Sequence, residues 1–489
     1  MIRGSWSGLN RKILLNFQWV LMVLRWLCFP FTAYFLPLFS SSVKKRLDFE
    51  CQNARDPLSK GWSGNIRADV AFEVSSEGEF EQAFPLIKVS LERDQRVEVF
   101  YASDSLEKRI QNVSKGSLTS YKERIRFIRM PLLSSFPLSL GKGQSFFQLV
   151  TAKKLFLCRY DFYPELLLYG AREGIDFVLL NATLKGKEAF LRREGTLKYL
   201  IYQSLYGLFD FILTATLRDL ELFKTLGMKE ERMLPFDLRV LQIESRTLVA
   251  EESLKMLPGM AFLNKLFKKV PFSDRLLMGS CWPSEMESLG CETLQKKIME
   301  KAQLVVLAPH KLSKESQNEL EKSYVSFCGT LPHFAPLTFV DLRSEKQDWE
   351  SLFNNWEKNP GPIVLTTPGI LLEAYTFFGS AFVGGGHGRS IHSVLEPFLA
   401  GCKVYCGPKT HRSTEFDLVS DISPSSIFVV HELRMFATIL NKKPDGQDQS
   451  SGNTLCSDED EQRRSFVALM GRRFLTILDF LGLGKEEKC

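Results

Sequence analysis

The chain has 489 residues, of which 44% are hydrophobic and 25% charged, and Lys plus Arg exceed Asp plus Glu by 6. This length predicts two or more domains, at roughly 100–200 residues per domain. The apolar content excludes a disordered protein, the small charge surplus excludes the basic surface of a nucleic-acid binder, and a mean hydropathy of −0.08 excludes a polytopic membrane protein.

The N-terminus carries an apolar block over residues 13–39, in which 21 of 27 side chains are hydrophobic. The block exceeds the roughly 20 residues needed to cross a bilayer, but Arg25 lies inside it and Pro30 and Pro37 interrupt its second half. Basic residues flank both sides: Arg3, Arg11 and Lys12 before it, and Lys44, Lys45 and Arg46 after it. This symmetry favours a helix that enters one leaflet from the cytoplasmic side over a single span or a cleaved signal peptide. We therefore predict a membrane anchor over residues 1–46.

Short apolar runs then alternate with helix-length amphipathic stretches, which is typical of buried parallel sheets in α/β proteins. Strands are predicted at 69–75, 97–101, 124–130, 154–158, 176–181 and 211–215, and again at 276–280, 304–309, 362–367, 380–386, 403–407 and 426–431. Two such sets predict two doubly wound domains, over residues 47–234 and 235–441. Their ligand is expected in a cleft at the carboxyl ends of the strands.

The C-terminal region begins with a polar stretch, residues 442–464, that is rich in Gly, Ser and acidic side chains and predicts a solvated loop. Asp458 and Asp460 have the spacing of a metal-binding pair, but a run of four acidic residues favours the solvated loop. Residues 465–489 are predicted to contain a final amphipathic helix. The 10 cysteines form no C-x-x-C pair, which favours free thiols in a reducing compartment.

The segment SSEGEF (75–80) follows the first predicted strand and opens a helix. Glu79 is therefore expected at the ligand-binding edge of the sheet, where a carboxylate can act as a general base. The pattern Ser76-x-x-Glu79 is also a capping box, in which the glutamate only holds the start of the helix. Local chemistry leaves these two interpretations equal.

A glycine-rich segment, SAFVGGGHGRSIHSVLEP (380–397), runs from a buried strand into a helix predicted to begin around residues 390–393. Backbone N–H groups at such a turn favour an anionic phosphate. Glu396 can bind ribose hydroxyls or complete a capping box with Ser393. His387 and His392 are five residues apart and cannot share one helix face, so no metal site is expected here. Ser280, His310 and Lys311 end two further strands, and we expect them in the same cleft.

The order of these motifs resembles the Kdo (3-deoxy-manno-octulosonic acid) transferases of Gram-negative lipid A assembly. The segments that carry the resemblance are SSEGE (75–79), RYDFYPE (159–165), LLNATL (179–184), PFDLR (235–239), GSCWPSE (279–285), LAPHK (307–311) and the glycine-rich segment (380–397). The glycine-rich segment and the S-x-G-E turn are the most specific of them.

The resemblance implies an α/β protein of the GT-B class: two doubly wound Rossmann-like domains with a cleft between them, plus an N-terminal anchor on the cytoplasmic face of the inner membrane. It implies transfer of Kdo from CMP-Kdo to a lipid A precursor of the lipid IVA type, with inversion and with neither metal nor cofactor. The implied partners are this lipid and the anionic membrane surface, without nucleic acid or an obligate protein partner. Lys265, Lys268 and Lys269 would suit such a surface, although a solvated face is the alternative.

Carried over by motif, Glu79 matches the catalytic base and Asp161 matches the second acidic residue of the family's acidic segment. Arg239 falls where a Lys or Arg meets the donor. The remaining donor-binding predictions are Ser280, His310, Lys311, Gly385, Gly386, His392, Ser393 and Glu396.

This chain departs from the family pattern at several positions, among them Glu73, Glu165, His310, Lys311 and Ser393. Several of these changes keep a polar side chain but alter contacts to the donor. Two alternatives therefore stand beside the leading prediction. One is a GT-B enzyme that transfers another activated sugar to a lipid-linked acceptor, and the other is a non-catalytic membrane scaffold of the same fold.

Overall fold

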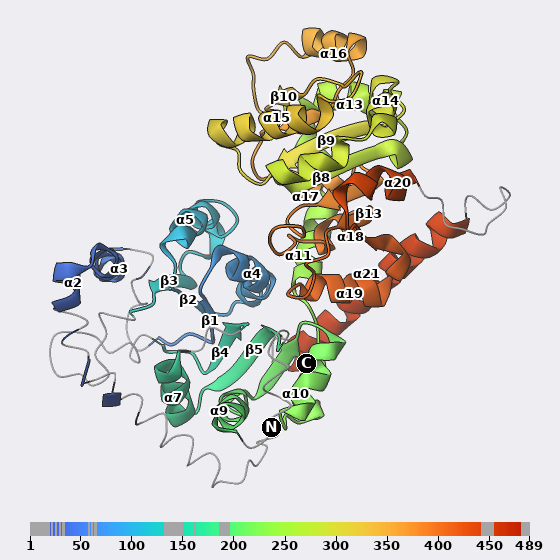
Figure 1. The fold of residues 1–489 in the computed structure, drawn as a ribbon. Helices are drawn as coiled ribbons and strands as arrows, with labels where there is room; N and C mark the ends of the chain where they lie inside the picture. The colour runs from blue at the N-terminus through green and yellow to red at the C-terminus, as the bar shows by residue number, and fades with distance from the viewer. Residues whose placement is uncertain are drawn as a thin grey trace. The chain divides into compact units, whose positions relative to one another are not determined.

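The computed structural model of the chain describes residues 20, 23–24, 27–28, 31, 35–56, 59, 62, 66–131, 150–159, 163–184, 196–441 and 454–480. The chain divides into two compact units, each built on one sheet (Figure 1). Unit 1 comprises Met1–Arg239 with Arg473–Cys489, and unit 2 comprises Val240–Arg472. The division lies a few residues after the boundary expected between residues 234 and 235.

Unit 1 contains a sheet of 7 described strands, all parallel, in the order β3-β2-β1-β4-β5-β6-β7. The strands are β1 (Val70–Val74), β2 (Val97–Tyr101), β3 (Ile125–Arg129), β4 (Lys154–Cys158), β5 (Asp176–Ala182), β6 (Phe211–Thr214) and β7 (Met233–Pro235). The order is that of a Rossmann-type sheet, and it reverses direction between β1 and β4. A ligand site is therefore expected where these two strands end.

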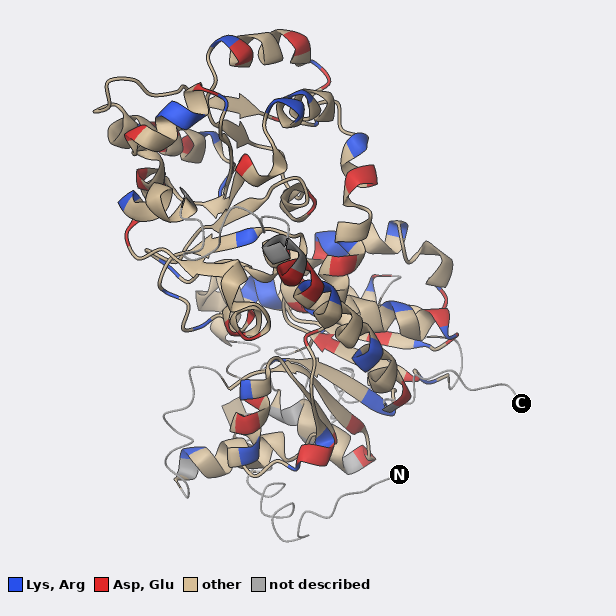
Figure 2. Cartoon of the chain, turned by 90° about the vertical axis from the view of Figure 1, so that its right-hand side faces the viewer, with Lys and Arg blue, Asp and Glu red and all other residues tan. Residues whose placement is uncertain are grey.

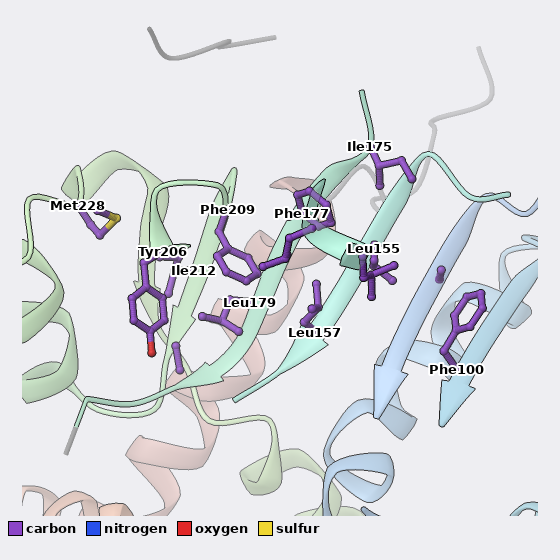
Figure 3. Close-up of a cluster of buried hydrophobic side chains, with 14 of the residues drawn as sticks. Phe100, Leu155, Leu157, Ile175, Phe177, Leu179, Tyr206, Phe209, Ile212 and Met228 are labelled. Atoms are coloured by element: carbon purple, nitrogen blue, oxygen red, sulfur yellow. The ribbon is translucent and has the colours of Figure 1, made fainter. Parts of the chain in front are cut away.

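The core of unit 1 explains why its strands are apolar at nearly every position. Phe72 on β1 lies beside Phe156 on β4, with ring centroids 4.7 Å apart. One face of the sheet packs a cluster that includes Leu155, Leu157 and Phe177 (Figure 3). Since both faces of a parallel sheet are covered, a strand needs apolar residues on both sides.

Unit 2 repeats this architecture with 7 described parallel strands in the order β10-β11-β9-β8-β12-β13-β14. The strands are β8 (Arg275–Cys281), β9 (Leu304–Pro309), β10 (Thr338–Val340), β11 (Ile363–Leu365), β12 (Ser380–Val383), β13 (Lys403–Cys406) and β14 (Ile427–Val429). Successive residues of β8 enter different clusters, with Leu277 on one face and Leu276 and Met278 on the other. The prediction of two parallel α/β domains is confirmed, and the reversal of unit 2 lies between β8 and β12.

Helices connect the strands in both units. Those of unit 1 are α2 (Leu36–Phe39), α3 (Ser41–Cys51), α4 (Glu77–Glu92), α5 (Glu107–Lys115), α7 (Pro164–Glu173), α9 (Leu197–Tyr206) and α10 (Leu217–Thr225). From the unit boundary onward they are α11 (Arg239–Leu248), α12 (Ala250–Lys255), α13 (Met260–Lys269), α14 (Glu292–Met299), α15 (Lys314–Cys328), α16 (Trp349–Lys358), α17 (Leu371–Tyr375), α18 (Leu395–Leu399), α19 (Thr414–Ile422), α20 (Phe436–Asn441) and α21 (Thr454–Phe480).

Helix α21 begins at Thr454, inside the segment expected to be a solvated loop. The acidic residues 458–461 lie beyond the first turn of this helix. Asp460 pairs with Arg463 at 2.7 Å, and the Arg463 guanidinium lies over the Phe398 ring. These contacts stabilise the acidic segment as helix rather than loop. The rest of the expected loop, residues 442–453, lies outside the described residues.

The N-terminal block lies largely outside the described residues. Among the helices that are described, none combines the length and the apolarity needed to cross a membrane. Arg46, one of the basic residues expected to flank the membrane anchor, binds within unit 1: it pairs with Glu50 at 2.6 Å and donates to the carbonyls of Ala102 and Met130. Those carbonyls directly follow β2 and β3, where the strand pairing ends, and they need hydrogen-bond donors. This need explains why Arg46 binds to unit 1.

Charges of both signs are interspersed over the molecule (Figure 2). The lysines on α13 that were expected to suit an anionic surface illustrate this pattern. Lys265 pairs with Glu350 and Lys269 pairs with Glu357 at 2.7 Å, so two of the three face carboxylates of α16. This arrangement agrees with a solvated, salt-bridged face.

Candidate functional site

The carboxyl end of β1 leads directly into α4 and places Glu79 at the reversal point of unit 1. The Ser76 hydroxyl accepts a hydrogen bond from the Glu79 backbone N–H at 3.4 Å, and Glu79 Oε2 accepts one from the Ser75 N–H at 2.7 Å. This is the reciprocal pattern of a capping box, shifted by one residue at the Ser75 side. Glu79 is only 8% exposed. The hydrogen bonds of a capping box are therefore present, and they involve one of the two carboxylate oxygens of Glu79.

Further polar side chains gather beside Glu79. The Ser75 hydroxyl donates to Glu73 Oε1 at 3.0 Å and lies 3.2 Å from the Tyr163 hydroxyl. Tyr163 precedes α7 and follows β4, so both sides of the reversal point contribute to this cluster. The other predicted acidic residue of this segment, Asp161, lies outside the described residues. The cluster thus brings carboxylates and hydroxyls together at the carboxyl end of β1.

Cys158, which ends β4, lies next to the same cluster. Burial raises the pKa of its thiol well above the ordinary value, and the Glu79 and Glu73 carboxylates raise it further. A thiol in such surroundings stays protonated and is a poor nucleophile. Cys158 donates to the backbone carbonyl of Glu79 at 3.8 Å and packs as a small buried side chain.

Arg239, predicted to meet the donor, lies at the end of unit 1. Its Nε is 2.9 and 3.0 Å from the two carboxylate oxygens of Asp237, and its Nη2 also binds Asp237. Asp237 is buried. The guanidinium is therefore held in one orientation by a carboxylate two residues away. Whether it meets a donor remains a prediction.

In unit 2 the glycine-rich turn follows β12 and packs against the end of β8. Gly384 has no room for a side chain, because an added Cβ would lie 2.8 Å from Glu285 Oε2 and closer still to the Ser280 carbonyl. Gly385 has φ +110°, and Ser280 itself has φ +52°. A non-glycine residue in that region is strained, and such strain is concentrated at functional sites. Ser280 thus lies against Gly384, the residue before Gly385 and Gly386, and donor binding by Ser280, Gly385 and Gly386 stays a prediction.

The buried carboxylate of Glu285 holds this turn. Glu285, on the 3-10 helix η8 (Pro283–Leu289), accepts the Gly385 N–H at 2.7 Å and the Trp282 N–H at 2.9 Å. The Gly385 N–H is therefore directed at a carboxylate, which corrects the expectation that it is available to an incoming phosphate. Helix α18, expected to start around residues 390–393, begins at Leu395 and is only 5 residues long.

Three aromatic rings are stacked above the turn. Trp282 and His310 have ring centroids 4.5 Å apart, and His310 and His392 are also 4.5 Å apart. The Arg389 guanidinium lies 4.4 Å from the centre of the Trp282 ring on a cation–π contact. The stack brings predicted donor residues from the ends of β9 and β12 together with Trp282 and Arg389, which were not predicted.

The surroundings of both stacked imidazoles favour the neutral form. Burial lowers the pKa of His310, and the charges of Arg389 and Lys311 lower it further. Burial also lowers the pKa of His392, with His310 as the second cause. A neutral imidazole has one N–H donor and one acceptor nitrogen, so the stack can hydrogen-bond a ligand without carrying charge. Positive charge at this edge comes from the exposed Lys311 and Arg389.

The remaining predicted residues of the segment have local roles. Ser393 Oγ accepts the Glu396 N–H at 3.4 Å, which is one half of the expected capping box. His387 Nε2 lies 2.8 Å from the Val430 carbonyl, in a different contact from His392. Among the described residues, no group of three or more His, Cys, Asp or Glu side chains could hold a metal ion.

A substitution of Gly384 tests how tightly the turn is packed. Gly384→Ala is expected to lower the free energy of unfolding by about 1–3 kcal/mol, because its Cβ cannot be placed without moving the backbone. Gly388→Ala is the matched control, since nothing lies within 4 Å of its added Cβ. Urea unfolding followed by tryptophan fluorescence measures both variants. Equal midpoints would contradict the close packing of Gly384 on Glu285.

The ionisation of Glu285 predicts a pH dependence of stability. Burial raises the pKa of Glu285 from 4.5 to about 7, against the opposing effect of its two backbone hydrogen bonds, and the pKa of the adjacent Cys281 thiol is raised as well. Between pH 4.5 and about pH 7 the folded protein keeps a proton on Glu285 that the unfolded chain has released. The free energy of unfolding therefore falls as the pH rises through this window.

The size of this effect is on the order of 3 kcal/mol between pH 5 and pH 8. Glu285→Gln is expected to flatten the pH profile of the urea unfolding free energy by that amount, whereas Glu292→Gln, at an exposed position nearby, is expected to leave it unchanged. Parallel profiles for the protein and Glu285→Gln would show that Glu285 does not titrate in this window.

The sequence signal for Glu285 was local and partial. Trp282-Pro283-x-Glu285 has proline at the first helical position and glutamate at the third, which predicts a carboxylate that caps the Trp282 N–H. No local pattern indicates that the same carboxylate binds Gly385, 100 residues further along the chain.

Comparison with known families gives a match to part of the chain. Residues 41–237 match the family model described as 3-Deoxy-D-manno-octulosonic-acid transferase (kdotransferase). The resemblance stated from the sequence is therefore confirmed for this part of the chain, and it supports a glycosyltransferase. A search of curated proteins found no match.

Several solved structures are similar to the chain at low sequence identity. The C-terminal CMP-Kdo binding domain of WaaA from Acinetobacter baumannii is 16% identical, with 44% of this chain and 97% of that chain covered and a TM-score of 0.27. UDP-GlcNAc 2-epimerase from Neisseria meningitidis bound to UDP-GlcNAc is 9% identical, with 76% and 90% covered and a TM-score of 0.47. A glycosyltransferase from Rickettsia africae is 11% identical, with 85% and 99% covered and a TM-score of 0.46.

Proposed function

We propose that this protein, whose residues 41–237 match the N-terminal domain of the Kdo transferases, is a glycosyltransferase that transfers Kdo from CMP-Kdo to a lipid A precursor with inversion. One observation carries the proposal: within the matched region, Glu79 lies at the end of β1, at the reversal point of the unit 1 sheet. Parallel α/β sheets bind their ligands at that point.

On the acceptor side, Glu79 takes the proton from the attacking sugar hydroxyl of the lipid. The hydroxyl oxygen forms the new bond to the anomeric carbon of Kdo, and the bond from that carbon to the phosphate oxygen of CMP breaks. CMP leaves with the electron pair of that bond. A carboxylate whose Oε2 is fixed by the Ser75 N–H is pre-oriented for this step.

On the donor side, unit 2 supplies the groups that meet the nucleotide and its phosphate. Lys311 and Arg389 provide positive charge for the phosphate, and the neutral rings of His310 and His392 provide hydrogen bonds. Ser280 and Arg239 are further donor contacts in this proposal. Stabilisation of a leaving phosphate by cations and N–H dipoles is the main electrostatic contribution such a reaction needs.

The proposal places the reaction at the cytoplasmic face of the inner membrane. Large apolar side chains of the N-terminal region are exposed, among them Leu38 at 75% and Phe39 at 85%. Exposed apolar residues next to Lys44 and Lys45 suit the surface of an anionic bilayer, where the lipid acceptor resides. Binding to vesicles with and without anionic lipid measures this part of the proposal.

The direct test incubates the purified full-length protein with CMP-Kdo and a lipid A precursor and determines the mass of the lipid product. The expected result is a mass increase corresponding to at least one Kdo residue, together with the release of CMP. A screen of other activated sugars accompanies it, because His310 and Lys311 differ from the family pattern. Transfer of a different sugar would replace Kdo in the proposal, and no transfer from any donor would overturn it.

A further inference from the structure

Glu285 connects two segments that lie far apart in the sequence. Its carboxylate is 1% exposed, and its two oxygens accept different backbone hydrogens: Oε2 that of Trp282 and Oε1 that of Gly385. The turn after β8 and the turn after β12 are thus held by a single carboxyl group. Above its pKa of about 7 this group is ionised, and hydrogen bonds to an ionised acceptor are stronger than those between neutral groups.

The stacked rings connect the same two turns through a second set of contacts. The ring of Trp282 packs on His310, and His310 packs on His392. The backbone N–H of His392 then donates to the carbonyl of Gly384 at 3.1 Å, next to the amide that Glu285 binds. Starting from Glu285, the contacts run through Trp282 and the imidazoles and return to Glu285 through the glycine turn.

We propose that Glu285 is a positioning residue, which fixes the stacked rings of Trp282, His310 and His392 and the glycine turn in the arrangement that receives the donor nucleotide. The role of the nucleotide in this statement rests on the proposed function. Glu285 itself touches no substrate, because both of its oxygens face backbone N–H groups of the protein. It acts through the two turns that it joins.

This arrangement needs both acceptor oxygens of a carboxylate. An ionised carboxylate offers two acceptor oxygens, one for each N–H, whereas a glutamine side chain offers one oxygen and an NH₂ group that would face the second N–H. Glu285→Gln therefore keeps the size of the side chain and loses one of the two attachments. Glu287→Gln removes the same charge two residues away, where the carboxylate pairs at 2.6 Å with the exposed Arg434.

The experiment compares the full-length protein, Glu285→Gln and Glu287→Gln in two measurements. Calorimetry measures the binding of CMP, and NMR of protein labelled at histidine measures the pKa values of the imidazoles. Glu285→Gln is expected to weaken CMP binding roughly tenfold, because a hydrogen bond to a charged group is lost. It is also expected to raise the pKa of His310 and His392 toward their ordinary values, since a loosened stack is better solvated. Glu287→Gln is expected to change neither.

Unchanged histidine pKa values and unchanged CMP affinity in Glu285→Gln would overturn the proposal. If CMP binds none of the three proteins, the proposed donor is wrong, but the histidine measurement still decides the role of Glu285. If Glu285→Gln does not fold, the amide signals of Trp282 and Gly385 in the unaltered protein decide instead. They are expected to shift together with one carboxyl titration, and independent behaviour of the two amides contradicts the proposal.

Discussion

Glu79→Gln is expected to lower the rate of sugar transfer by about 10²–10⁴-fold while leaving unit 1 folded. The structure makes this substitution a sharp test, because the two interpretations of Glu79 require different properties of the side chain. Capping requires only an oxygen that accepts the Ser75 N–H, which now lies 2.7 Å from Oε2. A glutamine provides that oxygen but cannot take a proton from the acceptor hydroxyl.

Single-turnover transfer and thermal unfolding of the same samples separate the two roles. Glu77→Gln is the matched control, since it removes a carboxylate from the first turn of the same helix at an exposed position. The expected pattern is loss of transfer with little change in stability for Glu79→Gln, and no effect on transfer for Glu77→Gln. Normal transfer by Glu79→Gln would assign Glu79 to capping alone.

The sequence predicted the fold well because strand burial is a local property. Runs such as residues 97–101 and 154–158 are apolar at nearly every position, and both coincide with strands, β2 and β4. The strand ends could also be predicted, and with them the positions of Glu79 and Ser280. In parallel sheets the carboxyl ends share one edge, so local strand assignments already group these residues within each unit.

The contacts that define the donor-side arrangement could not be predicted in the same way. Whether Gly385 donates to a phosphate or to a protein carboxylate depends on Glu285, which reaches it from the other side of the sheet reversal. Likewise, the stacking of His310 on His392 joins two strand ends that are not neighbours in sequence. Such contacts depend on sheet order and side-chain packing, which no local pattern encodes.

Arg46 illustrates the opposite error, in which a local pattern was interpreted too simply. It belongs to a run of basic residues after the apolar block, a pattern typical of a membrane-proximal flank. Its guanidinium nevertheless satisfies carbonyls at the ends of β2 and β3, while Glu50 balances its charge. Composition cannot distinguish a basic residue that faces lipid from one that caps a sheet edge.

Glu98→Gln is expected to lower the free energy of unfolding of unit 1 by about 3–5 kcal/mol, the largest stability effect that we predict. Glu98 is fully buried on β2 and accepts four hydrogen bonds. Two come from Arg126 on β3, and two come from the backbone N–H and the hydroxyl of Thr151, at 3.0 and 2.6 Å. The substitution removes the charge that faces the buried guanidinium and replaces an acceptor with a donor.

Urea unfolding with a signal from unit 1 measures this effect, and Glu92→Gln is its control. Glu92 pairs with Lys88 at 3.7 Å, but both side chains are about half exposed, so its loss should cost less than about 1 kcal/mol. Glu98→Leu combined with Arg126→Met is expected to recover most of the stability, because desolvating a charge pair costs much of what the pair gains. A double variant as unstable as Glu98→Gln would instead show that the hydrogen bonds to Thr151, rather than the charge on Arg126, make Glu98 indispensable.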